Sequence, residues 1–101
     1  MHIQNLSISA ITITEIYAGC REHEKNITEN LLSSLFTIPV RGYIAKEAGK
    51  FIYSFARKGK VLDVADAIIG VTAQLKGLVL ITQNVKDFPM LYPSQIEEFP
   101  D

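Results

Sequence analysis

One segment between residues 61 and 88 restricts the fold more than any other part of the chain: VLDVADAIIGVTAQLKGLVLITQNVKDF. Asp63 can cap an apolar helix, and Gly77 ends that helix before the strand LVLIT at 78–82. A polar loop follows the strand. Helices that alternate with short strands rich in Val, Ile and Leu are typical of a parallel sheet with helices on both faces. The segment therefore predicts the α/β class.

The rest of the chain shows the same alternation. Residues 6–11 suit a short strand, and a helix is predicted from Thr12 or Thr14 with Gly19 near its end. Pro39 limits its surroundings to a short or edge strand, and a weak final strand is predicted at 96–99. Two further helical stripes are Ile27, Leu31, Leu32 and Leu35, and then Ile44, Ala48, Phe51, Ile52 and Phe55 before a stop at Gly59. For the helix after Asp63 we expect a buried stripe of Val64, Ala65, Ile68, Ile69, Thr72 and Leu75.

Size and composition narrow the possible classes. A chain of 101 residues, 48% of them hydrophobic, is long enough for one domain, which we expect to span 1–101. Ten basic and eleven acidic residues give a net charge of -1, so RNA binding would have to rest on a local patch. The candidate patch is Lys46, Lys50, Arg57, Lys58 and Lys60, although a solvated helix face explains it more simply.

The cysteine and histidine content and the length of the apolar runs argue against a structural zinc site, a signal peptide and a membrane helix. Cys20, His2 and His23 cannot build a four-ligand zinc site within one chain. The N-terminus lacks the basic region of a signal peptide. No apolar run reaches the roughly 20 residues that a membrane helix needs. We therefore expect a cytoplasmic protein with no membrane partner.

Four polar side chains are predicted at one rim of the sheet. Glu15 follows the first strand, Asn84 and Asp87 follow the strand at 78–82, and Asp66 lies in the first turn of a helix. Ligands of parallel sheets bind outside the carboxyl ends of the strands. Clustered carboxylates repel one another unless a cation such as Mg²⁺ or Mn²⁺ binds them. Such an ion can activate water against a phosphodiester, which gives hydrolysis a physical route.

Each of these residues also has a purely structural explanation. Asp63 followed by Asp66 is typical of a helix cap with an acidic first turn, and Glu15 in a first turn would also complement a helix dipole. Asn84 and Asp87 are ordinary turn formers. The spacing alone leaves both explanations open.

Three segments together resemble the PIN domain of the VapC toxin type: ISAITITEIYAG at 8–19, VADAIIGVTA at 64–73 and LITQNVKDF at 80–88. The resemblance covers nearly the whole chain and implies a metal-dependent ribonuclease related to toxin–antitoxin pairs. It makes Glu15 and Asp66 acidic metal ligands and Asp63 the cap. A further acidic position of the family falls at Asn84, with Asp87 as its partner or substitute.

The resemblance lacks one part at the start. PIN domains open with a strand that ends in an aspartate, whereas this chain begins Met-His and continues with what resembles the second strand. We therefore expect an N-terminally truncated PIN-like fold with weak binding of Mg²⁺ or Mn²⁺ and impaired cleavage of RNA. Unpaired strand edges are costly to bury. We expect the strands near Ile8 and Val79 to pair directly, or another copy of the chain to complete the sheet in a homodimer.

Two other functions remain in view. One is a catalytically silent PIN fold that binds an antitoxin-like protein or its own copies, and metal affinity separates it from the nuclease. The other is a receiver-like regulatory domain, which needs an acidic pair at the end of an early strand. LSISAITITE supplies one acid, so this third function ranks last.

Overall fold

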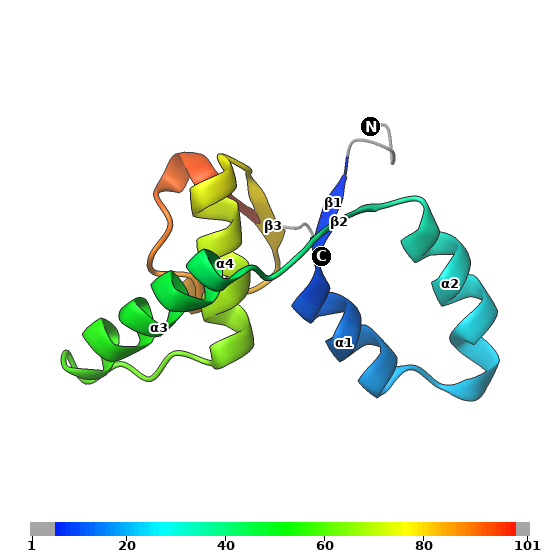
Figure 1. Ribbon diagram of the computed structural model, residues 1–101, viewed down its shortest axis with the longest axis horizontal. Helices are drawn as coiled ribbons and strands as arrows, with labels where there is room; N and C mark the ends of the chain where they lie inside the picture. Colours follow the sequence, from blue (N-terminus) through cyan, green and yellow to red (C-terminus); the bar gives the residue numbers. More distant parts are fainter. Residues whose placement is uncertain (1–5, 99–101) are drawn as a thin grey trace. The chain divides into compact units, whose positions relative to one another are not determined.

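The computed structural model describes residues 6–98, and the chain divides into two compact units, one up to Pro39 and one from Val40 onward (Figure 1). The first unit contains β1 (Ser7–Ser9), α1 (Ala10–Gly19), the short 3-10 helix η2 (Glu22–Glu24), α2 (Lys25–Ser33) and β2 (Phe36–Ile38). The second contains α3 (Gly42–Ala56), α4 (Val64–Lys76), β3 (Leu80–Thr82), η3 (Val85–Asp87), η4 (Pro93–Gln95) and β4 (Ile96–Glu98). Parallel strand pairs combined with helices confirm the predicted α/β class.

In the first unit, β1 and β2 form a parallel pair in which Ile8 lies opposite Thr37. The helix α1 begins at Ala10, because the Ser9 hydroxyl accepts a hydrogen bond from the Ile11 amide at 3.3 Å and so caps the helix. The predicted start at Thr12 or Thr14 was therefore wrong, and the predicted strand was too long at its end. A serine that closes a strand can also cap the helix that follows it.

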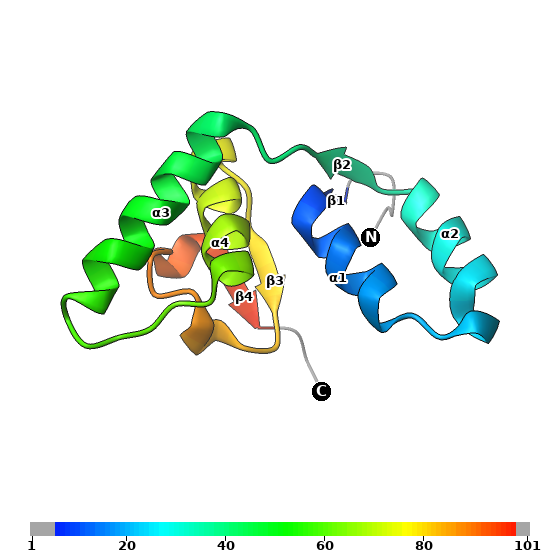
Figure 2. The same cartoon turned by 60° about the horizontal axis from the view of Figure 1, so that its bottom comes forward.

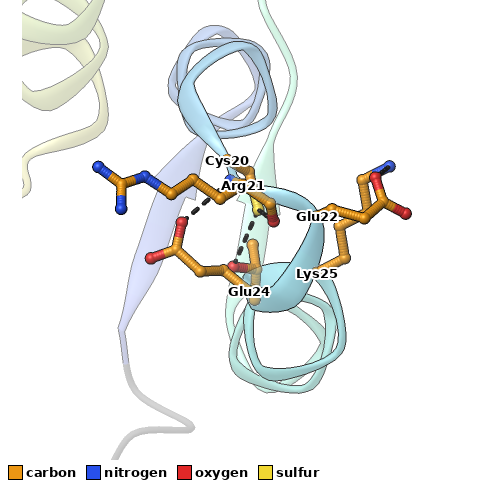
Figure 3. A network of polar contacts seen from close by, with 6 residues as sticks. Cys20, Arg21, Glu22, Glu24 and Lys25 are labelled. Carbon is orange, nitrogen blue, oxygen red and sulfur yellow. Dashed lines mark hydrogen bonds and ion pairs between the residues drawn. The ribbon is translucent and has the colours of Figure 1, made fainter.

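Local hydrogen bonds hold the connection between α1 and α2 (Figure 3). The Arg21 amide donates to the Glu24 carboxylate at 2.9 Å, and the Glu24 amide donates to the Arg21 carbonyl, also at 2.9 Å. Lys25 and Glu22 form an ion pair at 2.9 Å on the exposed side of the turn. Each of these contacts joins residues three positions apart in the sequence. They therefore order the turn without the help of a buried core.

One side-chain hydrogen bond joins the two helices of this unit. The Tyr17 hydroxyl donates to the Glu29 carboxylate at 2.8 Å. This hydrogen bond raises the pKa of Tyr17 above its ordinary value, and desolvation and the negative charge of Glu29 raise it further. The phenol is therefore stabilised in its neutral form.

In the second unit, α3 packs against α4, and α4 lies between α3 and the parallel pair β3 and β4 (Figure 2). One core cluster consists of the buried side chains Ile44, Ala48, Ala67 and Val71. A second consists of Leu62, Phe88 and Met90, and it extends to Leu80 and Ile96 in the two strands. Phe51 and Ile52 of α3 pack against both clusters, which makes the core continuous. The predicted apolar face of α3 is confirmed.

The buried face of α4 agrees with the predicted stripe at Thr72, Ile68 and Ile69 and differs from it elsewhere. Its buried residues are small for the most part, namely Ala67, Gly70, Val71, Thr72 and Ala73. Val64 and Leu75, both predicted to be buried, are 60% and 45% exposed. The small side chains allow the neighbouring elements to approach the helix closely, whereas the prediction followed the larger apolar residues. Both predicted ends are confirmed, with Asp63 as cap and Gly77 in the left-handed conformation at φ 65°.

Some predictions are not tested by this structure. His2 and Phe99, the predicted end of the final strand, lie outside the described residues. The single domain over 1–101, the direct pairing of strands near Ile8 and Val79, and completion by a second copy all stay predictions. Within residues 6–98, no helix has the length and apolar character needed to cross a bilayer.

Candidate functional site

Glu15 lies on α1 in the first unit and is exposed. Because α1 begins at Ala10, Glu15 falls in the second turn, and the first turn contains no acidic residue. The expectation that Glu15 complements the helix dipole in a first turn was therefore wrong. The dipole acts on charges within the first turn and falls off beyond it. The structural explanation for this carboxylate is correspondingly weaker.

Asp63 and Asp66 have different roles at the start of α4. The Asp63 carboxylate accepts a hydrogen bond from the Asp66 amide at 3.2 Å, so Asp63 is the cap, as predicted. Asp66 lies in the first turn and is half-buried. The capping function is thus performed by one of the two acids, and the carboxylate of the other is not the cap.

Asn84 and Asp87 lie in a tight turn directly after β3. The Asn84 amide donates to the Thr82 hydroxyl at 3.1 Å, and the Asp87 amide donates to the Asn84 carbonyl at 3.0 Å. Both hydrogen bonds use backbone amides, so they fix the turn and leave the Asn84 and Asp87 side chains out of it. Asn84 is exposed and Asp87 half-buried.

The face of α4 that begins at Asp66 packs along the segment that follows this turn. Gly70 lies four residues after Asp66, hence on the same face of the helix. A Cβ at Gly70 would lie 2.5 Å from the Met90 sulfur and 3.3 Å from a Phe88 ring carbon. One turn later, the side-chain amide nitrogen Nε2 of Gln74 donates to the Met90 carbonyl at 3.5 Å. Close packing at Gly70 therefore fixes the loop after β3 against the helix that carries Asp66.

The second unit thus contributes Asp66, Asn84 and Asp87 to the candidate site, whereas Glu15 belongs to the first unit. Nowhere in the described part of the chain do three side chains of His, Cys, Asp or Glu gather closely enough to hold a metal ion. The available donors are carboxylate and amide oxygens, which are the ligands that Mg²⁺ and Mn²⁺ prefer. The donor chemistry therefore fits such an ion. The charged candidate ligands within the second unit are Asp66 and Asp87.

Two structural contributors were missed by the sequence predictions. Gly70 was not singled out, although a glycine inside a helix is unfavourable and signals that another element approaches closely. Lys86 was also missed. Its carbonyl accepts a hydrogen bond from the Lys60 ammonium at 3.3 Å, next to Asp87. No short-range pattern in the sequence joins residues that are this far apart.

Comparisons with known proteins agree on one family. The sequence model described as PIN domain matches residues 1–89. The chain is 33% identical over 85 residues to ribonuclease VapC10 of Mycobacterium tuberculosis, and the match covers 84% of this chain and 64% of that protein. It is 27% identical over 104 residues to the tRNA(fMet)-specific endonuclease VapC of Salmonella typhimurium, with 98% and 79% covered. The chain therefore spans slightly less than two thirds of the length of VapC10.

A solved structure gives the same result. A chain of a toxin–antitoxin complex from Klebsiella pneumoniae superimposes with a TM-score of 0.72 and 33% sequence identity. The match covers 90% of this chain and 71% of that chain. The fold and the sequence are therefore similar to those of the same group of proteins.

Proposed function

This chain belongs to the PIN domain family and resembles the VapC ribonucleases of toxin–antitoxin systems, and from this we propose that it is a cytoplasmic, metal-dependent ribonuclease of reduced activity. The observation that carries the proposal is the packing of α4 against the loop after β3. Through Gly70 this packing anchors the loop of Asn84 and Asp87 to the helix that carries Asp66. These are positions at which the family resemblance expects acidic ligands.

The proposed ligands differ in what they supply. Asp66, Asp87 and Glu15 would offer carboxylate oxygens to Mg²⁺ or Mn²⁺, and Asn84 would offer an uncharged amide oxygen. Such an ion, when bound, supplies the charge that activates water and stabilises a phosphodiester under attack. Affinity for a hard cation rises with the charge of its ligands. An asparagine at one position supports weak metal binding and low turnover.

Calorimetric titration of Mn²⁺ tests the assignment of Asp66. We expect saturable binding to the unaltered protein and its loss in Asp66→Asn, because the substitution removes one charge and keeps the shape of the side chain. Asp63→Asn is the matched control, since asparagine also caps helices well. The control should bind Mn²⁺ like the unaltered protein. Binding that survives Asp66→Asn would refute the role of this residue.

The missing charge at Asn84 has a test of its own. We expect Asn84→Asp to bind Mn²⁺ about tenfold more tightly, because a further carboxylate joins the ligand set. Cleavage of an RNA oligonucleotide in the presence of Mn²⁺ should become faster in the same variant. An unchanged affinity and an unchanged rate would contradict the view that Asn84 limits the activity.

A second candidate function is a catalytically silent PIN fold that binds an antitoxin-like protein or copies of itself. It is favoured by the likeness to a chain of a toxin–antitoxin complex and by exposed apolar residues on α2, where Ile27 is 74% and Leu31 54% exposed. Absence of Mn²⁺ binding in both the unaltered protein and Asn84→Asp would favour this function. A monomer in dilute solution, measured by light scattering, would count against self-association.

A further inference from the structure

The basic residues of this chain are unevenly distributed. Eight of the ten follow Val40: Arg41, Lys46, Lys50, Arg57, Lys58, Lys60, Lys76 and Lys86. Three of these fall within the four residues 57–60, RKGK, which contain no acidic residue. A net charge of -1 for the whole chain therefore hides a local concentration of positive charge.

The backbone after α3 gathers these three cations in one turn. Gly59 adopts a positive φ of 83°, and the Lys60 amide donates to the Phe55 carbonyl at 2.9 Å, so the chain folds back onto the last turn of the helix. The Lys60 ammonium donates to the Lys86 carbonyl at 3.3 Å. This hydrogen bond joins the turn to the loop of the candidate site, at the residue next to Asp87.

No carboxylate within residues 6–98 forms an ion pair with Arg57, Lys58, Lys60 or Lys86, since the ion pairs there are Lys25 with Glu22 and Lys50 with Glu47. The dipole at the C-terminal end of α3 favours a cation there, which accounts for Arg57, the C-cap of the helix. It does not account for Lys58 and Lys60, which follow the cap, or for Lys86, which lies after β3. An anionic ligand would complement all four.

An exposed aromatic ring adjoins this group. Tyr53 is 65% exposed, and the Arg57 guanidinium lies over its ring, 5.6 Å from the centroid. The same guanidinium donates to the Tyr53 hydroxyl at 3.1 Å, which holds the two groups together. Stacked aromatic and guanidinium groups are the surfaces on which unpaired nucleic acid bases stack.

We propose that Arg57, Lys58, Lys60 and Lys86 form a phosphate-binding strip for single-stranded RNA, with Tyr53 as a platform for one base. The choice of RNA as the polyanion rests on the proposed ribonuclease function. The strip runs from the end of α3 to the loop of Asn84 and Asp87, so a strand bound along it is delivered to the candidate metal site. The aromatic platform favours RNA over an acidic polypeptide, which has no bases to stack.

Fluorescence anisotropy with a labelled single-stranded RNA oligonucleotide in EDTA measures this binding without turnover. Each phosphate contact contributes about 0.7 to the slope of log affinity against log salt for single strands. The double variant Lys60→Gln with Lys86→Gln should therefore lower the slope by about 1.4. Arg41→Gln with Lys76→Gln is the control, with the same change of charge in the same unit, and its slope should equal that of the unaltered protein. Circular dichroism should show an unchanged fold in both.

The platform is tested with two substitutions of one residue. Tyr53→Leu should weaken RNA binding about fivefold, because it removes the ring on which a base stacks. Tyr53→Phe keeps the ring and should retain most of the affinity.

Three results would overturn the proposal. The first is that the unaltered protein does not bind RNA. The second is that the salt slope falls equally in the control variant. The third is that Lys60→Gln with Lys86→Gln loses binding to poly-glutamate, an acidic polypeptide, and keeps its binding to RNA. The third result would identify an acidic protein as the partner. Because this assay contains no free metal, failure of Mn²⁺ binding would refute the nuclease function and leave the RNA strip standing.

Discussion

The two units of this protein contain comparable elements and differ in what they bury. Among residues 6–98, each unit has two α-helices and one pair of parallel strands. In the unit up to Pro39, neither α1 nor α2 has a buried residue, and the buried side chains among its described residues are Ser9 and Ile38. In the unit from Val40 onward, two apolar clusters share Phe51 and Ile52 as neighbours. Local hydrogen bonds maintain the first unit, and apolar packing maintains the second.

This difference indicates that the second unit provides both most of the stability and most of the candidate site. Burial of apolar surface is the main favourable contribution to folding, so the second unit should account for most of the stability. The same unit holds Asp66, Asn84 and Asp87, together with the basic strip at the end of α3. A site supported by a packed core keeps its geometry. Regions with few buried contacts open at a lower free energy.

The largest expected effect is at Ile44, whose side chain is 0% exposed in the core of the second unit. Ile44→Ala removes buried methyl groups and leaves a cavity, which should lower the free energy of unfolding by about 2–5 kcal/mol. Urea denaturation followed by circular dichroism measures the change.

The matched control for Ile44 is Ile27, which is 74% exposed on α2. Ile27→Ala makes the same chemical change on a surface, so it should alter the free energy of unfolding by less than about 0.5 kcal/mol. Equal losses in the two variants would contradict the contrast between the two units.

The second expected effect concerns the caps, since each unit has one helix capped by a short polar side chain. Asp63→Ala removes the 3.2 Å hydrogen bond to the Asp66 amide and should cost about 1 kcal/mol. Ser9→Ala removes the 3.3 Å hydrogen bond to the Ile11 amide and should cost about 0.5 kcal/mol, because α1 has no buried residues to couple its end to a core. Hydrogen exchange of the first-turn amides measures both, and a larger cost at Ser9 would reverse the ranking of the units.

Local chemistry could be predicted from the sequence, and close packing could not. The cap at Asp63 and the stop at Gly77 follow from the conformational preferences of single residues, and both are confirmed. The buried face of α4 was predicted only in part, because Met90, twenty residues after Gly70, packs closely on small residues that the prediction left out. The start of α1 was mispredicted because Ser9 suits both a strand and a cap.

In the candidate site, too, local positions could be predicted from the sequence and close packing could not. Asp66 and Asp87 could be placed at a helix start and in a loop after a strand, because each position depends on its own neighbours. The packing of that loop on α4 depends on the absence of a side chain at Gly70 and on the side chains of Phe88 and Met90, and no local pattern connects these three residues. Their grouping with Glu15 remains a proposal for the metal titrations.

The smallest expected effect is in the first unit, at the hydrogen bond between Tyr17 and Glu29. The pKa of Tyr17 is raised in the folded state, chiefly by this hydrogen bond, so its contribution to stability is present below the ordinary tyrosine pKa of about 10. The contribution is lost as the pH rises through the higher folded-state pKa, when the phenolate forms beside the Glu29 carboxylate. Tyr17→Phe should therefore be slightly less stable than the unaltered protein at neutral pH, and the difference should shrink in alkali. Titration by tyrosinate absorbance checks the cause: Glu29→Gln should lower the pKa of Tyr17 toward its ordinary value, and an unchanged titration would show that the hydrogen bond does not form in solution.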